Sequence, residues 1–348
     1  MISIDGSKHS GSGTILRYSA ALACVTGEPL HVYNIREKRP RPGLRPQHLK
    51  ALEACCHMTS GELEGAETGS REIFFRPGSG PRGGTFHWDI GTAGSTTMLA
   101  FALIPPALFA DAPSTFSLKG GLFQDFAPSA HHMGKVLLPL LHAMGGEVQV
   151  EVLKPGYVPL GGGHLKLRVS PLREPLQPLN LVDQGKEWRF RGISLASHLK
   201  GEKVSRRMAA AADRILEKEG FGAQWEIHDD SSASQKGAAL LVYVHTDTGC
   251  LLGADQAGKP GRQSEKIARF VVRSLLEDLR SPATVDRHLA DQIIIFAALA
   301  EGKTQYILPC ITDHVESNLW LVKKILGADF HWKGNLLSIN GIGLLRNS

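Results

Sequence analysis

The pattern of apolar and polar positions along the first 170 or so residues has two periods, which follow one another in turn. Short stretches with period two indicate strands, and longer stretches with apolar residues every third or fourth position indicate helices. The first such unit predicts strands at residues 2–4, 30–35, 62–67 and 72–76, and helices at 15–26 and 47–58. The second predicts strands at 84–90, 114–118, 147–153 and 164–169, and helices at 98–108 and 132–144. Both units follow the order β-α-β-α-β-β, and equivalent loops lie roughly 80 residues apart, which indicates a duplication.

A third unit fits the C-terminal part of the chain. It predicts helices at 285–300 and 316–326 and strands at 305–307, 329–332 and 336–339, but its first strand has no clear candidate. The stretch between the second and third units differs in character, with strands expected at 188–194, 223–227, 239–246 and 250–254 and helices at 203–219 and 264–279. We therefore predict an α+β (α/β) fold in which three repeated β-α-β-α-β-β units form a large domain. That domain comprises residues 1–177 plus 279–348, and residues 178–278 form a smaller inserted α/β domain.

Composition narrows the class of protein only moderately. The 348 residues carry a net charge of +5, which permits a polyanionic partner without requiring one. The five cysteines show no CxxC spacing, which favours a reduced, cytoplasmic protein and disfavours a zinc site. We expect no membrane association, because no apolar run is long enough to span a bilayer and the N-terminus lacks a signal-peptide pattern.

Two loops of the first unit are candidates for phosphate binding. The stretch DGSKHSGSGTILR joins a strand to a helix, where backbone N–H groups can face an anion, but it lacks the Gly-x-x-x-x-Gly-Lys-Ser/Thr motif. The stretch IREKRPRPGLRPQHL is the densest cluster of positive charge in the chain. Its prolines restrict the backbone, and the planar fork of arginine suits bidentate contacts with phosphate. A solvated basic loop is the alternative.

Other motifs are weaker. The loops GTAGSTT and VPLGGGHLKL could also expose N–H groups, although a tight hairpin is the favoured interpretation of the three glycines. The basic face of helix 203–219 is favoured as a solvated surface over a polyanion contact. His314 occupies the same place in the third unit as the arginine loop does in the first. Asp291 and Gln292 lie near the start of an apolar helix, where capping alone would explain the aspartate.

Taken together, these motifs resemble the RNA 3'-terminal phosphate cyclase family over nearly the whole chain. The resemblance is carried, in family order, by DG…GTILR, IREKRPRPGLRPQHL, ELEGAETGS, TAGS, LKGG…AP, GYVPLGGG, LADQ and NGIG. The arginine-rich stretch and GYVPLGGG are the most specific of these. The family fold has repeated β-α-β-α-β-β units with a smaller α/β domain inserted before the last repeat, as the apolar pattern predicts.

The resemblance implies an activity. Members of the family use ATP and a divalent metal, Mg or Mn, to convert the 3'-phosphate of an RNA to a 2',3'-cyclic phosphate. A histidine attacks the α-phosphate of ATP and forms a covalent enzyme–AMP, the AMP moves to the RNA 3'-phosphate, and the vicinal 2'-OH displaces it. A neutral imidazole is a competent nucleophile toward phosphorus, and cations offset the crowded phosphate charge.

Individual positions are carried over by their match to the family motifs. His314 matches the nucleophile, and Asp291 and Gln292 match a pair beside the nucleotide. Pro128 and His288 fall where the family sandwiches the adenine, although the second position is usually Tyr. Four further residues resemble the polar side chains that surround the phosphates in the family: Arg17, Arg36, Arg39 and Gln47.

Three positions depart from the family pattern, one of them a Gln of the first loop that Lys8 or His9 replaces. Ser10 stands where the family has a Glu that resembles a metal ligand, and Phe101 replaces a Gln of the nucleotide pocket. A hard metal prefers carboxylate oxygen, so the loss of this Glu should weaken metal binding.

Four functions remain open on the sequence. An ATP-dependent RNA 3'-phosphate cyclase is favoured, because His314, the arginine loop and LADQ are retained. The runner-up is a non-catalytic, cyclase-like protein that binds RNA in ribosome biogenesis. A third possibility keeps the adenylation chemistry but acts on another phosphate-ended nucleic acid. An enolpyruvyl transferase, which shares the repeat architecture, would need a different arrangement of Lys and acidic residues.

Overall fold

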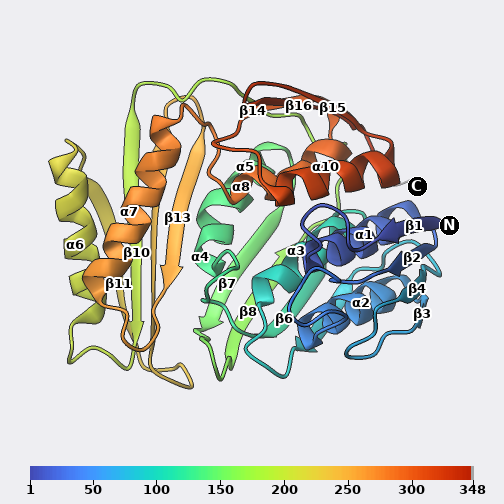
Figure 1. Ribbon diagram of the computed structural model, residues 1–348, viewed down its shortest axis with the longest axis horizontal. Coiled ribbons are helices and arrows are strands. Elements are labelled where there is room, and N and C mark those ends of the chain that lie inside the picture. The colour runs from blue at the N-terminus through green and yellow to red at the C-terminus, as the bar shows by residue number, and fades with distance from the viewer. Residues whose placement is uncertain (346–348) are drawn as a thin grey trace.

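The computed structural model describes residues 1–345, which form four four-stranded sheets, each with helices packed against it (Figure 1). The first sheet has the order β1-β2-β4-β3, from β1 (Ile2–Asp5), β2 (Leu30–Tyr33), β4 (Ile73–Arg76) and β3 (Glu62–Glu64). Strands β1 and β2 are parallel, and α1 (Gly13–Thr26) and α2 (Pro46–Thr59) connect and follow them. Both helices agree with the apolar pattern to within two residues.

The second sheet has the order β5-β6-β8-β7. Its strands are β5 (Gly84–Asp89), β6 (Ser114–Gly120), β8 (Gly163–Val169) and β7 (Val148–Lys154). Helix α3 (Thr96–Leu108) follows β5. The helix expected at 132–144 consists of α4 (Ala130–His132), the π-helical turn η1 (Met133–Leu137) and α5 (Leu138–Ala143), a detail that apolar periodicity does not encode.

The third sheet has the order β15-β16-β14-β9. It contains β15 (Asp329–Lys333), β16 (Leu336–Ile342), β14 (Glu301–Ile307) and the two-residue strand β9 (Asn180–Leu181), which pairs in parallel with β14. The helix expected at 285–300 was wrong at its start, because residues 285–288 are not helical. It begins with α8 (Leu289–Gln292) and, after Ile293, continues as α9 (Ile294–Leu299); α10 (Asp313–Leu326) follows β14.

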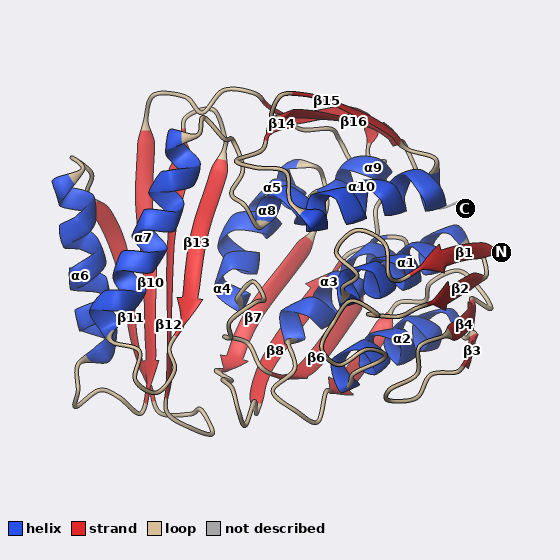
Figure 2. Cartoon of the chain, in the orientation of Figure 1, coloured by secondary structure: helices blue, strands red, loops and turns tan. Residues whose placement is uncertain are grey.

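The fourth sheet has the order β11-β10-β12-β13. Its strands are β11 (Ala223–Asp230), β10 (Trp188–Ser197), β12 (Gly237–Thr246) and β13 (Leu251–Ala257), with α6 (Val204–Lys218) and α7 (Ser264–Arg280) side by side on one face (Figure 2). The first three sheets share the strand order first-second-fourth-third, and this sheet does not. The mixed α/β class is as expected, whereas the division into 1–177 plus 279–348 and 178–278 stays a prediction.

Helix α1 brings the first three sheets together. It contacts α2, α3 and α10, and its residues from Gly13 to Cys24 are all buried. Loops that precede these helices therefore converge near the N-terminal ends of α1 and α10. In residues 1–345, no helix is long and apolar enough to cross a membrane.

Candidate functional site

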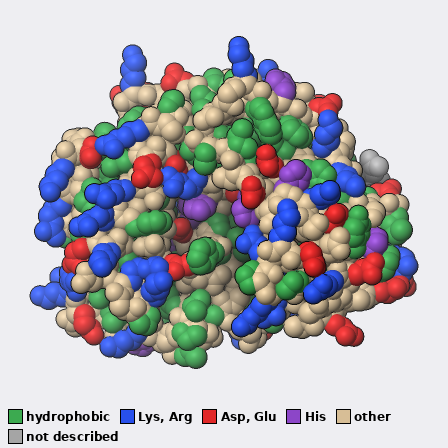
Figure 3. Space-filling model, in the orientation of Figure 1, with side chains coloured by type: hydrophobic (Ala, Val, Ile, Leu, Met, Phe, Trp, Pro, Cys, Tyr) green, Lys and Arg blue, Asp and Glu red, His purple; other side chains and the backbone are tan. Residues whose placement is uncertain are grey.

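A cavity of about 460 Å³ opens beside the N-terminus of α10. Its walls come from the C-terminal part of α7, the segment around α8 and the loop before α10, and they include His288, Asp291, Cys310 and His314. The space-filling view shows a hollow at the middle of this face with histidine side chains at its edge (Figure 3). The cavity therefore collects residues that are separated by nearly forty positions in sequence.

His314 lies in the first turn of α10. The helix is capped by Thr312, whose Oγ1 accepts a hydrogen bond from the Val315 N–H at 3.2 Å. The His314 ring is half-buried, and its Nδ1 has no hydrogen-bond partner among residues 1–345. Burial lowers the pKa of His314, and the charges of Arg39 and Arg17 lower it further. The ring is therefore neutral at pH 7, with a lone pair available for bonding to an electrophile.

Arg17 reaches this region from α1. Its side chain is only 5% exposed, and its Nη2 donates to Thr14 Oγ1 at 3.3 Å and lies 3.1 Å from Met98 Sδ. Burial lowers the pKa of Arg17 to about 10, although the group stays charged at neutral pH. No ion pair with a carboxylate is formed by Arg17 within the described chain. A buried cation without an ion-pair partner is stabilised when an anion binds beside it.

The arginine loop is folded back on itself. Arg36 has a left-handed backbone, with φ of 57°, and its Nη1 donates to the carbonyl oxygens of Arg41 and Gly43 at 2.8 Å each. Burial lowers the pKa of Arg36, and Arg45 and Arg39 lower it further. Arg39 is half-buried and close enough to influence His314. Arg36 thus has a structural task in closing the loop, in addition to any contact with a ligand.

Residues 5–12 are tied to both neighbouring elements. Lys38 Nζ donates to the carbonyl oxygen of His9 at 3.1 Å. On the other side, Ser317 Oγ donates to Ser10 Oγ at 2.8 Å and accepts from the Ser10 N–H at 3.2 Å. Ser317 lies about one helical turn after His314, so this loop, the arginine loop and the start of α10 form one connected unit.

The neighbourhood of Ser10 does not fit a protein-held metal. Its hydroxyl is already engaged with Ser12 and Ser317. Among residues 1–345 there is no group of three or more His, Cys, Asp or Glu side chains that could hold an ion. A hard cation prefers several oxygen ligands, and this loop offers no carboxylate at the expected position.

Asp291 does not cap a helix, so that interpretation of the sequence was wrong. The N–H groups of His288 and Leu289 are instead capped by the carboxylate of Asp286, at 2.8 and 2.9 Å. Within residues 1–345, the Asp291 carboxylate receives one long hydrogen bond, 3.4 Å, from Asn318 Nδ2 to its Oδ2. Burial raises the pKa of Asp291 to about 7, and the nearby Asp286 charge adds to the effect.

Comparison with known proteins decides the family. The family model described as RNA 3'-terminal phosphate cyclase matches residues 8–332. This chain belongs to that family. A protein named RNA 3'-terminal phosphate cyclase from Archaeoglobus fulgidus is 39% identical over 97% of this chain and 100% of its own length. Proteins of the same name from Pyrococcus furiosus and Methanopyrus kandleri are 38% and 36% identical, covering 97% and 96% of this chain and 96% of each relative.

Among solved structures, the enolpyruvyl transferase NikO from Streptomyces tendae is 10% identical at a TM-score of 0.41. The match covers 99% of this chain and 50% of that one. This likeness is too weak to carry an argument.

Not every position carried over from the cyclase family motifs lines the cavity. His288 does, and it is exposed. Pro128 is buried, with its carbonyl oxygen accepting from Thr97 Oγ1 at 2.8 Å, and Gln47 Oε1 accepts from the Ser95 N–H at 3.0 Å. Gln292 is buried, and its Oε1 has no hydrogen-bond partner among residues 1–345. Phe101 is part of the apolar core.

The GGG motif connects β7 to β8, as a hairpin interpretation requires, but the connection spans residues 155–162 and is not a tight turn. Gly161 has a φ of 70°, and a Cβ there would lie 2.9 Å from Ala93 Cα and from the Thr92 carbonyl oxygen. Glycine at this position therefore lets the GYVPLGGG loop pack directly on the TAGS loop. The two motifs of the cyclase family support each other.

Two residues near the site were missed by sequence reasoning. His48 is buried, its Nδ1 accepts from the Arg45 N–H at 3.2 Å, and burial together with Arg17 and Arg36 holds its pKa well below the usual range. Asn318 is buried and donates to the carbonyl oxygen of Asp291 at 2.8 Å, while its Oδ1 has no partner in the described chain. A signal existed for Asn318: asparagine is a poor helix former, and it lies four residues after His314.

Proposed function

We propose that this protein is an ATP-dependent RNA 3'-terminal phosphate cyclase that forms a covalent histidine–AMP intermediate at His314. The observation that carries the proposal is the state of this ring: it is neutral, half-buried beside a cavity, and its Nδ1 has no partner. Membership of the cyclase family supports the substrate class, an RNA with a 3'-phosphate, and ATP as the nucleotide.

The first step is attack of a His314 nitrogen on the α-phosphorus of ATP. The new P–N bond replaces the bond to the leaving oxygen, and pyrophosphate departs with that electron pair. The second ring nitrogen keeps its proton, so the adduct is a phosphoramidate. The charges of Arg39 and Arg17 both lower the pKa of His314, so these two cations lie close to the reacting ring. We assign them to stabilising the negative charge that develops on the phosphate oxygens.

The later steps transfer the activation to RNA. An oxygen of the RNA 3'-phosphate attacks the phosphorus of the adduct, the P–N bond breaks with its electron pair going to nitrogen, and His314 leaves as the neutral ring that still carries the proton on its second nitrogen. The vicinal 2'-OH then attacks the 3'-phosphorus, closes the cyclic phosphate and releases AMP. Asp291, with a pKa of about 7, can be protonated at neutral pH and donate a hydrogen bond to the nucleotide. Gln292, whose buried Oε1 is without a partner, offers an acceptor beside it.

The metal of the family enters no step here, because the residues around Ser10 do not fit one. The proposed domain division, with residues 178–278 inserted between the second and third units, is compatible with the separate strand order of β11-β10-β12-β13.

Labelled ATP tests the proposal directly. Incubation of the protein with α-labelled ATP and either Mg or Mn should give a protein-bound label that is labile in acid and stable in alkali. His314→Asn should lose that label completely, whereas Cys310→Ser, at the other side of the same loop, should keep it. An unlabelled wild-type protein with both metals would contradict the proposal and favour the cyclase-like binding protein. Label retained in His314→Asn would also contradict it.

A further inference from the structure

One face of α7 carries an exposed stripe of basic and aromatic side chains. Lys266, Arg269, Phe270 and Arg273 are all exposed, and their spacing places them along one side of the helix. Phe270 is 51% exposed, although the opposite side of the helix is packed against the fourth sheet. Figure 3 shows Lys and Arg side chains gathered over α6 and α7 on this face.

The three cations of the stripe form no ion pair within residues 1–345, whereas several cations beside it do. Arg207 forms a bidentate pair with Glu265 at 3.0 Å, Arg280 pairs with Glu219, and Arg287 pairs with Glu277 and Asp278. In contrast, Lys266, Arg269 and Arg273 form no ion pair with any carboxylate of residues 1–345. The carboxylates near α7 therefore neutralise cations beside the stripe, and the charges of Lys266, Arg269 and Arg273 are left without a partner of opposite sign within residues 1–345.

A second aromatic side chain stands near the start of α7. Phe126 is fully exposed, and its backbone has a φ of 66°, a strained value for a residue other than glycine. Asp125, the residue before Phe126, anchors the loop that carries Phe126. It forms a bidentate ion pair with Arg262, with both contacts at 2.8 Å, and a longer contact of 3.9 Å with Lys259. An exposed aromatic ring on an anchored, strained backbone is a feature that folding alone does not explain.

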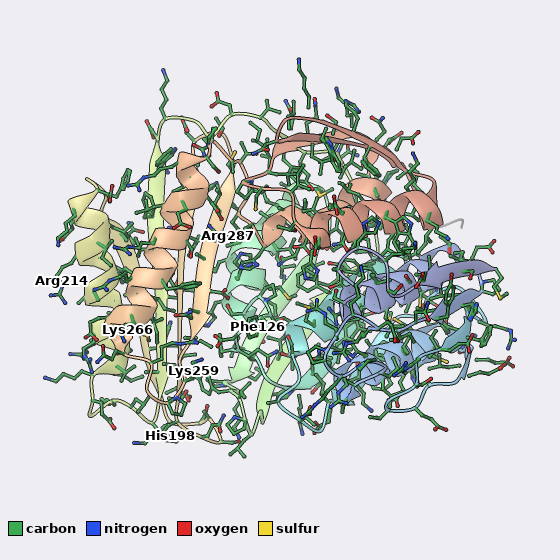
Figure 4. All side chains as sticks on the ribbon, viewed as in Figure 1. Phe126, His198, Arg214, Lys259, Lys266 and Arg287 are labelled. Carbon is green, nitrogen blue, oxygen red and sulfur yellow. The ribbon has the colours of Figure 1, made fainter. Side chains whose placement is uncertain are left out.

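The stripe leads into the cavity that contains His314. Glu277, Asp278 and Ser281, near the C-terminal end of α7, line that cavity. From Glu277 back to Lys266 the helix extends for about 16 Å, so the stripe continues the cavity along the surface. Figure 4 shows Lys266 on α7, Lys259 below it and Phe126 on a neighbouring loop to the right of both.

We propose that this surface binds the single-stranded RNA segment that precedes the terminal 3'-phosphate. Lys266, Arg269 and Arg273 would contact backbone phosphates, and Phe270 and Phe126 would stack on bases. Unpaired bases are required, because the ring faces of a duplex are hidden in its stack. The inference rests on the proposed function, because it takes the 3'-end to lie in the cavity beside His314.

Binding is measured with fluorescently labelled single-stranded oligoribonucleotides that end in a 3'-OH, so that no reaction occurs. Phe270→Ala should weaken binding roughly five- to 100-fold, from the loss of one stacked base. Lys266→Ala/Arg269→Ala/Arg273→Ala should reduce the slope of log affinity against log salt by about 2, because each phosphate contact contributes about 0.7 for a single strand. Phe126→Ala should also weaken binding.

Matched controls separate this surface from general charge and from folding. Arg173→Ala/Lys303→Ala/Lys333→Ala removes the same charge from other exposed positions, and Trp332→Ala removes a partly exposed aromatic from β15. Both controls should leave the affinity and the salt slope unchanged. All variants should form the labelled His314 adduct with ATP at the wild-type rate, since the stripe does not touch that ring.

Activity on substrates of different length completes the test. The stripe variants should raise KM for a long 3'-phosphorylated RNA and leave KM for a 3'-phosphorylated dinucleotide unchanged, because a dinucleotide is too short to leave the cavity. Unchanged affinity for long RNA, or an equal loss for both substrates, would overturn the proposal. A stripe that prefers duplex over single-stranded RNA would overturn it as well. A wild-type protein that forms no adduct with ATP would instead overturn the proposed function. In that case, the affinity of the stripe variants for the 3'-OH oligoribonucleotide would still decide whether the stripe binds RNA.

Discussion

Asp286 and Asp291 are five residues apart in sequence, and their surroundings are opposite. Asp286 is fully buried and accepts hydrogen bonds from His132 Nε2, from the Gly253 N–H and from the N–H groups of His288 and Leu289. Burial alone would raise its pKa, but the His132 charge and these hydrogen bonds lower it to about 2. Asp291 receives one long hydrogen bond from Asn318, and its pKa is raised to about 7.

The difference separates a structural carboxylate from one that is available to a ligand. Asp286 joins η1, β13 and α8 and has no further capacity to accept hydrogen bonds without losing one. Asp291 lines the cavity, and its Oδ1 accepts no hydrogen bond within the described residues. Three buried atoms near it also lack partners there: Gln292 Oε1, Asn318 Oδ1 and His314 Nδ1. Three of the buried polar atoms that lack a partner within residues 1–345 therefore lie around Asp291, where a ligand would complete them.

Removal of each carboxylate in turn gives the largest expected contrast. Asp286→Ala should lower the free energy of unfolding by about 3–5 kcal/mol, because it strands the buried His132 and several N–H groups. Asp291→Ala, the matched control, should cost far less at pH 8. Urea unfolding of both variants measures the difference. Equal losses would show that Asp291 is as much a structural group as Asp286.

The pH dependence of stability sharpens the same comparison. The pKa of Asp291 is higher in the folded protein than in the unfolded chain, so its stabilising contribution is complete below about pH 4 and is lost as the pH rises to about 7. Asp291→Asn should therefore equal the wild type near pH 4 and exceed it above pH 7 by up to about 4 kcal/mol. Thermal unfolding of the ligand-free protein across this range is the measurement. A gain that is the same at every pH would exclude ionisation of Asp291 as its cause.

The smallest expected effect concerns Ser10. Ser10→Glu would place a carboxylate at the position of the family ligand, and we expect a few-fold decrease in the metal concentration that gives half-maximal labelling of His314. Ser10→Ala controls for the loss of the contacts with Ser12 and Ser317. No change in Ser10→Glu relative to Ser10→Ala would show that any metal is held elsewhere.

The apolar pattern predicted most strands and helices because their burial follows simple periods. Helix α1 was placed to within two residues, since most of its residues other than Arg17 and Tyr18 are apolar or small. The pattern failed where tertiary contacts decide the structure. Strand β9 has two residues, too few for any period, and is defined by its pairing with β14. The expected helix 285–300 included residues 285–288, but Asp286 accepts hydrogen bonds from four donors there and the helix begins at Leu289.

The candidate site was predictable to the extent that its residues belong to specific motifs. His314, Asp291 and His288 do line one cavity. Sequence could not show that Arg36 is occupied in closing its own loop, because that depends on carbonyl oxygens of Arg41 and Gly43. Nor could it show that Asn318 supports Asp291, because that contact depends on how α10 packs against α8.

The contact between Ser10 and Ser317 joins residues 307 positions apart. During synthesis, the loop that contains Ser10 leaves the ribosome long before α10 exists, because a chain is made from its N-terminus. The surroundings of His314 cannot assemble until this last helix has docked on α1. On the proposed function, a nascent or C-terminally truncated chain that lacks α10 would lack His314 and could not form the adduct, so adduct formation would report completed synthesis.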